Sequence, residues 1–242
     1  MISLFTGAGG MDIGFQQAGF TTAVAVELDP NCVETLKANL PRTPILAGDI
    51  CTITAEDILT AGNLKVLEAA LVIGGPPCQS FSLAGKRLGM NDPRGRLLYE
   101  FFRVVHETLP VAFVLENVKG MTIWSGGKAI NAIKNEAAAE ILFEGNLYSY
   151  NVELKILNAA DFGVPQLRER VFIVGNRISK SFQFPEPTHS RPVNSGQLHF
   201  GNVQNWRSAG EALRSLPPAS APSDAAERTA RTIKKRIETH GY

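Results

Sequence analysis

The sequence predicts an α/β protein with a mostly parallel sheet and helices on both of its faces. Short apolar runs alternate along the chain with stretches whose apolar residues recur at helical spacing. Several of the runs end at glycine, proline or an acidic residue, as strands do where a chain leaves a sheet. In an open α/β sheet, ligands and catalytic groups gather beyond the carboxyl ends of the strands. We therefore expect the functional residues directly after the predicted strands.

Length and composition are those of a soluble globular protein. The 242 residues suffice for one sizeable core, or for one core plus an appendage, and 44% of them are hydrophobic. The net charge of +1 gives no overall signature of nucleic-acid binding, so any such surface must be local. Three cysteines, an odd number, argue against a disulfide framework and for a reducing, cytosolic setting. No apolar run approaches the ~20 residues that span a bilayer, so we expect no membrane association.

The first predicted strand, residues 2–5, runs into a glycine-rich turn at residues 6–10, and helical spacing follows from Met11. A strand, a glycine-rich turn and a helix together bring backbone amides close to a nucleotide-like ligand. The turn has the spacing Gly-x-Gly-Gly in place of the dinucleotide-binding Gly-x-Gly-x-x-Gly, which disfavours a nicotinamide cofactor. On its own, such a turn is structural about as often as it is functional.

The second and third predicted strands, residues 22–26 and 45–47, each lead to a carboxylate, Glu27 and Asp49. An acidic residue at the end of the second strand is where Rossmann-like sites bind ribose hydroxyls. A solvated loop carboxylate is an equally good interpretation of Glu27 before the rest of the chain is considered.

A cysteine lies shortly after the fourth predicted strand, residues 70–73. Two glycines and two prolines stop the strand, and Cys78 follows Pro77 directly. A thiol on a proline-stiffened loop at a strand end is placed to act as a nucleophile. Cysteine is also often an inert small hydrophobe, so this motif alone does not decide its role.

Helices and further strands complete the predicted α/β order. Asp29 and Pro30 begin a helix as N-cap and first-turn residue. The fifth strand, 112–115, ends at Glu116, and a basic run at 85–96 is predicted to be a mobile loop. The other predicted elements are helices over 97–109 and 130–141, strands over 147–157 and 171–174, and a short amphipathic, basic helix near 228–237.

Seven motifs in this order resemble those of the DNA cytosine-5 methyltransferases, over roughly residues 1–185. Any one of the motifs is weak, but their shared order and spacing are specific. They are Phe5-Thr-Gly-Ala-Gly-Gly10, Glu27, Gly48-Asp-Ile50, Gly75-Pro-Pro-Cys-Gln-Ser-Phe-Ser82, Asp92-Pro-Arg-Gly95, Glu116-Asn-Val-Lys-Gly120, and Asp161-Phe-Gly-Val-Pro-Gln166 with Arg168-Glu-Arg-Val-Phe172. The resemblance implies a Rossmann-like S-adenosylmethionine-dependent methyltransferase fold and a DNA methyltransferase in a bacterial restriction-modification setting, acting in the cytosol or nucleoid.

The resemblance also implies a covalent mechanism. In the family, a cysteine thiolate adds to carbon 6 of a flipped-out cytosine, so that carbon 5 can attack the methyl group of S-adenosylmethionine; Cys78 matches this cysteine. Glu116 matches the acid that meets ring nitrogen 3, and we expect burial without a cationic neighbour to raise its pKa. Arg168 and Arg170 match arginines that contact the base and the pocket. S-adenosyl-L-homocysteine would be the product, and no metal is expected.

The resemblance assigns two further groups of residues. Its cofactor-binding positions are Phe5, Gly7, Ala8, Gly10, Glu27, Asp49, Ile50, Pro77 and Leu97. Its positions for contacts with double-stranded DNA are Gln79, Ser80, Ser82, Lys86, Arg87 and Arg94, in or near a loop that closes over the duplex.

The C-terminal part departs from the family pattern. We expect a catalytic domain over 1–185 and, over 186–242, a proline-rich linker with short helices leading to a target-recognition domain that the sequence does not show. The chain would then be a truncated product or one subunit of a split enzyme that needs a second chain. A silent subunit that binds donor and DNA, and a nicotinamide-dependent oxidoreductase, are the alternatives.

Overall fold

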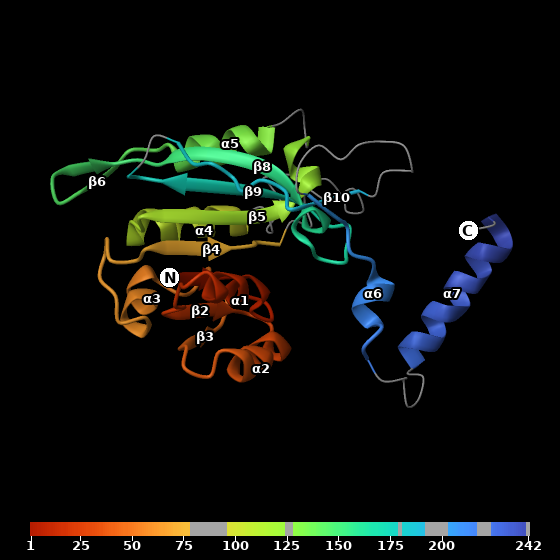
Figure 1. Ribbon diagram of the computed structural model, residues 1–242. Coiled ribbons are helices and arrows are strands. Elements are labelled where there is room, and N and C mark those ends of the chain that lie inside the picture. The colour runs from red at the N-terminus through yellow and green to blue at the C-terminus, as the bar shows by residue number, and fades with distance from the viewer. Residues whose placement is uncertain (78–95, 124–127, 179–180, 192–202, 217–223, 241–242) are drawn as a thin grey trace.

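The protein folds around one seven-stranded sheet (Figure 1). The structure is a computed structural model that describes residues 1–77, 96–123, 128–178, 181–191, 203–216 and 224–240. The strand order is β3-β2-β1-β4-β5-β9-β8. The strands are β1 (Ile2–Leu4), β2 (Val24–Glu27), β3 (Ile45–Ala47), β4 (Leu71–Gly74), β5 (Ala112–Val118), β8 (Asn151–Asn158) and β9 (Glu169–Asn176).

The sheet is mostly parallel, which confirms the predicted fold class. Strands β1 to β5 pair in parallel, and only β9 is antiparallel to its two neighbours, β5 and β8. Leu4 lies beside Val26 on one side and Gly74 on the other. The carboxyl ends of β1, β2 and β4 therefore meet at one edge of the sheet, where the glycine turn, Glu27 and the Pro76-Pro77 segment follow.

Helices lie on both faces of the sheet. The larger core cluster joins side chains of α3 (Ala55–Ala61), α4 (Arg96–Thr108) and α5 (Lys128–Ala137) to one face. Its centre is a group of edge-to-face aromatic rings: Phe101, Phe102, Phe113 and Tyr150. On the other face, Met11 and Phe15 of α1 (Gly10–Gln17) pack against a smaller cluster around Leu71 and Ile73.

Local sequence signals account for two of the helix starts. Asp29 caps α2 (Pro30–Asn39) by accepting hydrogen bonds from the amides of Asn31 and Cys32, as predicted. The start of α3 is a capping box between Thr54 and Asp57, in which each side chain accepts from the other residue's backbone amide. The sequence analysis missed α3, although this signal was present.

Three predicted boundaries were wrong. Strand β5 continues to Val118, so Glu116 lies within the strand and not after it. Residue Ile141 belongs to β6 (Ile141–Phe143) and not to the preceding helix, and the predicted strand over 147–157 is two strands, β7 (Asn146–Tyr148) and β8. A two-residue hairpin turn at Glu144-Gly145, where both residues have positive φ angles of 47° and 78°, pairs β6 with β7 and so accounts for the strand conformation of Ile141.

The C-terminal segment leaves the sheet. Trp206 is attached to the body because its indole Nε1 donates a 2.9 Å hydrogen bond to Asp161. Beyond β10 (His189–Ser190), β11 (Gln204–Asn205) and α6 (Ala209–Leu213), helix α7 (Asp224–His240) projects away from the sheet (Figure 1). Its Ile233 is 53% exposed. The expected boundary between 185 and 186 stays a prediction. Within the described residues, no helix is long and apolar enough to cross a membrane.

Packing at Gly175 gives the first prediction. A Cβ at this position in β9 would lie 2.1 Å from the ring of Phe113, which is fully buried and held by neighbouring aromatic rings. We expect Gly175→Ala to lower the free energy of unfolding by about 1–3 kcal/mol in urea denaturation. The control is Gly14→Ala in α1, where a Cβ meets nothing within 4 Å and should stabilise by roughly 0.5–1 kcal/mol. Equal effects of the two substitutions would contradict the packing argument.

Candidate active site

Six of the nine predicted cofactor residues line one cavity of about 560 Å³ at the carboxyl edge of the sheet. We call it the donor cavity, and its volume is in the usual range for small-molecule sites. The six are Phe5, Glu27, Asp49, Ile50, Pro77 and Leu97. Leu28, Asp29, Pro30, Val26, Gly48 and Gly75 complete its lining.

The other three predicted residues lie in the glycine turn but do not line this cavity. The amide of Gly7 donates to Glu27, the carbonyl of Ala8 accepts a hydrogen bond from Asn39, and Gly10 lines a neighbouring cavity. The turn therefore supports the donor cavity through its backbone, and whether it contacts a ligand stays a prediction.

Glu27 is fixed by three backbone amides. One carboxylate oxygen accepts from Leu28 and Asp29 at 2.9 and 2.8 Å, and the other accepts from Gly7 at 2.6 Å. A carboxylate offers about four acceptor positions, so one position on the second oxygen remains for a ligand. Glu27 thus has two tasks, since it ties the glycine turn to the end of β2 and can still accept one hydroxyl.

The loop after β3 is held by an arginine that the sequence analysis missed. Arg103 of α4 donates through Nη2 to the carbonyls of Ile50 and Ile53, both at 3.0 Å. Its other nitrogens are occupied by Glu100 at 2.7 Å and Glu107 at 3.0 Å. This guanidinium fixes the backbone beside Asp49 and Ile50. No local signal identifies such a contact, because the two partners lie about 50 positions apart.

A second cavity of about 440 Å³ adjoins the donor cavity, and Phe5 and Gly75 line both. We call it the Glu116 cavity. Ser3, Thr6, Asp12, Glu116, Arg168 and Phe172 are among its lining residues. A Cβ on Gly75 would lie 3.2 Å from the Glu116 carboxylate, so only glycine leaves the chain this close to Glu116 without displacing it.

Glu116 is partly buried, and it has cationic neighbours that the sequence analysis did not expect. Burial raises the pKa of its carboxyl group, as predicted, but Arg170 and Arg168 act in the opposite direction. Arg170 Nε lies 2.9 Å and Arg168 Nη2 3.8 Å from Glu116 Oε1. The expectation of no cationic neighbour was therefore wrong. The pairing follows from register, since Glu116 and Arg170 project from the adjacent strands β5 and β9. The net shift is still upward, so burial outweighs the two arginines.

Cys78 lies outside the described residues, as do the predicted DNA contacts Gln79, Ser80, Ser82, Lys86, Arg87 and Arg94. The start of their loop is described. Asn117, which is buried, donates a 3.1 Å hydrogen bond to the carbonyl of Pro76 and so ties the loop to β5 beside Glu116. Pro77 then lines the donor cavity. Cys32 and Cys51 are free thiols whose pKa values burial raises, which disfavours the nucleophilic thiolate at both.

Known proteins similar to this chain are DNA methyltransferases. A family model described as C-5 cytosine-specific DNA methylase matches residues 1–240. Type II methyltransferase M.AquIA of Picosynechococcus is 59% identical, over all of this chain and 98% of the relative. M.SacI of Streptomyces achromogenes is 39% identical over 95% of this chain and 61% of the relative. M1.HphI of Haemophilus parahaemolyticus is 42% identical over 78% of this chain and 49% of the relative.

Solved structures agree in fold. A protein described as a DNA modification methyltransferase encoded within an E. coli prophage superposes with a TM-score of 0.69 and 27% identity, covering 90% of this chain and 55% of its own. Dnmt2 of Spodoptera frugiperda gives a TM-score of 0.55 and 22% identity, covering 76% of this chain and 52% of its own, which shows a shared fold alone.

The two arginines beside Glu116 give the second prediction. A cation favours the ionised carboxylate, so removing one should raise the pKa of Glu116 further. We expect Arg170→Gln to raise it more than Arg168→Gln, because Arg170 is the nearer of the two. A carboxyl-carbon NMR titration measures both variants against the wild type. A fall in the pKa in either variant would contradict the proposed balance.

Proposed function

Because the chain belongs to the family of C-5 cytosine-specific DNA methylases, we propose that it carries the catalytic site of a DNA cytosine-5 methyltransferase of a restriction-modification system. It would methylate carbon 5 of a cytosine flipped out of double-stranded DNA, with S-adenosylmethionine as donor. The observation that carries the proposal is the adjacency of two cavities. The donor cavity and the Glu116 cavity share Phe5 and Gly75 as common lining, and the chain that leads to Cys78 begins between them.

The donor cavity fits a charged nucleoside such as S-adenosylmethionine, which would supply an electrophilic methyl group. Ile50, Pro77 and Leu97 offer apolar contacts for an adenine ring. Asp49 would accept a hydrogen bond from the adenine amino group. The acceptor position that remains on Glu27 would bind one ribose hydroxyl, which is fewer than a carboxylate free of backbone contacts could bind.

In the Glu116 cavity, the residues would activate the base. The Cys78 thiolate adds to carbon 6 of the cytosine, forming a carbon–sulfur bond and making carbon 5 nucleophilic. Glu116, whose pKa burial raises, would give a proton to ring nitrogen 3 as charge develops there. After methylation, loss of the carbon 5 proton expels the thiolate, and the proton on ring nitrogen 3 returns to Glu116, which restores the neutral ring and the acid. Arg168 and Arg170 would hold the base or its phosphate through their planar donors.

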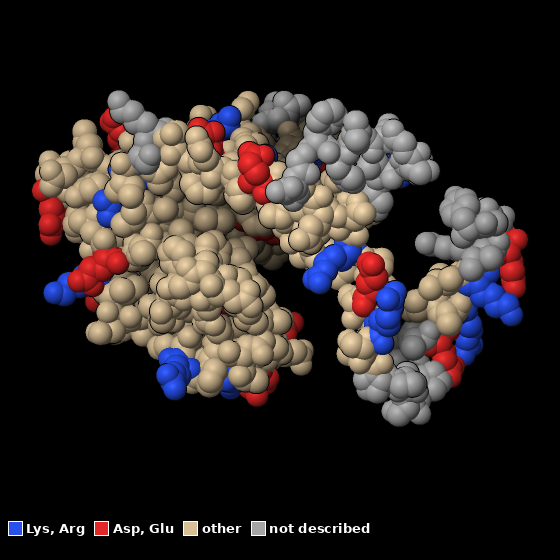
Figure 2. Space-filling model, in the orientation of Figure 1, with Lys and Arg blue, Asp and Glu red and all other residues tan. Residues whose placement is uncertain are grey.

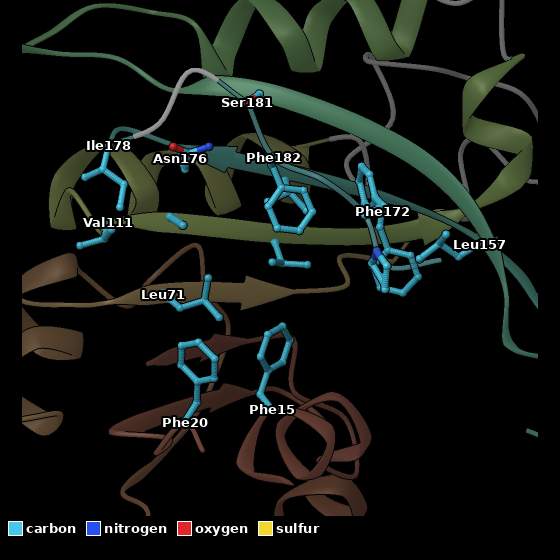
Figure 3. Close-up of a pocket in the computed structure, with 15 residues that line it drawn as sticks. Phe15, Phe20, Leu71, Val111, Leu157, Phe172, Asn176, Ile178, Ser181 and Phe182 are labelled. Atoms are coloured by element: carbon cyan, nitrogen blue, oxygen red, sulfur yellow. The ribbon is translucent and has the colours of Figure 1, made fainter. Parts of the chain in front are cut away.

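A second polypeptide is proposed because one sheet face carries an open apolar groove of about 590 Å³ (Figure 3). Phe15 and Phe20 project into it from the α1 side, and Phe182 lies on the other side of Leu71. Of the described residues that line the groove, Phe15 alone belongs to a helix. Parallel sheets are normally covered on both faces, so a helix from a partner would complete this one.

Helix α7 offers a second unpacked surface. Ile233 is 53% exposed although it lies in the middle of an amphipathic helix. Figure 2 shows both acidic and basic side chains among the described residues of α6 and α7. We propose that the partner carries the side chains that read the target sequence, since phosphate contacts alone supply no sequence preference. Family membership sets the nicotinamide alternative aside.

Substitution of the nucleophile gives the third prediction. Cys78→Ser should abolish methyl transfer because a hydroxyl is far less nucleophilic than a thiolate, while donor affinity measured by calorimetry stays close to that of the wild type. A variant with wild-type turnover would rule out the covalent mechanism, and loss of methyl transfer relative to an active wild type would rule out the silent-subunit alternative.

Glu27→Gln should have the complementary effect to Cys78→Ser, because it should weaken donor binding. The amide nitrogen cannot accept a hydrogen bond, so one contact to a backbone amide or to the ribose is lost, and donor binding should weaken by about 1.5–3 kcal/mol. Glu34→Gln, at an exposed residue paired only with Lys37, should leave affinity unchanged. Unchanged affinity in Glu27→Gln would remove this carboxylate from the binding site.

The fourth prediction concerns the partner. Residues 1–242 purified alone should bind the donor, self-associate through the apolar groove, and fail to methylate duplexes of varied sequence in a site-selective manner. Methyl transfer assays and sedimentation velocity measure the two properties. Robust site-selective methylation without any added protein would contradict the proposed need for a second chain.

A further inference from the structure

A buried carboxylate beneath the glycine turn has no role in the mechanism above. Asp12, the third residue of α1, is fully buried. Its Oδ2 accepts a hydrogen bond from Ser3 of β1 and its Oδ1 accepts one from Thr22, which precedes β2, both at 2.9 Å. Burial raises the pKa of this carboxyl group, and the two hydroxyl groups oppose that rise.

As a carboxylate, Asp12 fixes the direction of the hydrogen bonds around it. A carboxylate can only accept, so Ser3 must give its single hydroxyl proton to Asp12. The oxygen of Ser3 is then an acceptor toward the Thr6 hydroxyl 3.1 Å away, which shares its single proton between this oxygen and the carbonyls of Ser3 and Val26, both at 3.2 Å. Thr6 is the first residue of the glycine turn, and its carbonyl accepts a hydrogen bond from the amide of Gly9. The Ser3 contact therefore links Asp12 to the turn, whereas the Thr22 contact leads away from it.

The link matters because it flanks Phe5, whose backbone conformation is unfavourable. Its φ angle is 52°, in the left-handed region that a residue with a bulky side chain rarely adopts. Such a conformation costs of order 1–3 kcal/mol and persists only where the surroundings hold it. Ser3 and Thr6 lie on either side of Phe5 in the sequence, and their hydroxyl groups meet in the buried network. Phe5 lines both the donor cavity and the Glu116 cavity.

We propose that Asp12 is a positioning residue that acts through Ser3 and Thr6 to hold Phe5 and the glycine turn in the geometry that the donor cavity requires. A merely structural alternative is that Asp12 only fastens α1 to the sheet. The two contacts of the same carboxylate separate these roles, because they have the same length and equal burial but only one leads to the turn. The effect on donor binding rests on the function proposed above, while the effect on the turn itself does not.

The test compares Ser3→Ala with Thr22→Val in the full chain. Amide hydrogen exchange at Gly7 and Gly9, followed by NMR without ligand, reports on the turn; calorimetry with S-adenosyl-L-homocysteine reports on donor affinity. Ser3→Ala should speed exchange at both amides and weaken affinity by about fivefold, the usual worth of one net hydrogen bond. Thr22→Val should lower the melting temperature as much as Ser3→Ala does. It should change neither amide exchange at Gly7 and Gly9 nor the affinity for S-adenosyl-L-homocysteine.

Thr6→Val removes the same link from its other end, together with the contacts of the Thr6 hydroxyl to the carbonyls of Ser3 and Val26, and should speed exchange and weaken affinity at least as much as Ser3→Ala, so the test does not depend on one variant folding. Equal effects of Ser3→Ala and Thr22→Val on the turn, or no effect of Ser3→Ala, would overturn the inference. If the wild type bound no donor, the proposed function would fail, and the exchange rates alone would decide the role of Asp12.

Discussion

Parallel pairing of β1 with β2 and β4 is the constraint on which the site depends. The pairing brings the carboxyl ends of these strands to one edge, so that the glycine turn, Glu27 and Pro77 converge around one cavity. Close approach is then possible only with glycine at the end of β4. A Cβ on Gly74 would lie 2.9 Å from the Leu4 carbonyl, and one on Gly75 would approach Glu116. The two cavities adjoin at Phe5 and at Gly75, which line both.

Electrostatics at Glu116 are a balance between two opposing effects. Burial favours the neutral acid, and the two arginines favour the carboxylate. Arg168 lines the same cavity as Glu116, and Arg170 reaches the Glu116 carboxylate from the neighbouring strand β9. The net shift is upward, which under the proposed mechanism favours a carboxyl group that can donate a proton to the base.

The sequence predicted the parts of the site that follow strands directly. Glycine, proline and acidic residues after short apolar runs predicted the positions of Glu27, Asp49 and Pro77, which line the donor cavity, because those signals are local. The contacts that hold these residues in place could not be predicted from the sequence. Arg103 holds carbonyls about 50 residues away, Asn117 holds Pro76, and Asp12 joins two strands through hydroxyl groups. Such contacts depend on how elements pack, and the residue types involved are common on any surface. The extent of β5 was missed because Glu116 and Asn117 are polar residues inside a strand.

The proposed attack of Cys78 on a cytosine in the Glu116 cavity is tested most directly with duplex DNA that contains 5-fluorocytosine, incubated with the donor and the active enzyme, partner included. Fluorine at carbon 5 cannot leave as a proton does, so the carbon–sulfur bond formed in the first step persists after methyl transfer. Peptide mass spectrometry should find the methylated base attached to Cys78. Attachment at Cys32 or Cys51, or methyl transfer with no adduct at Cys78, would contradict the account.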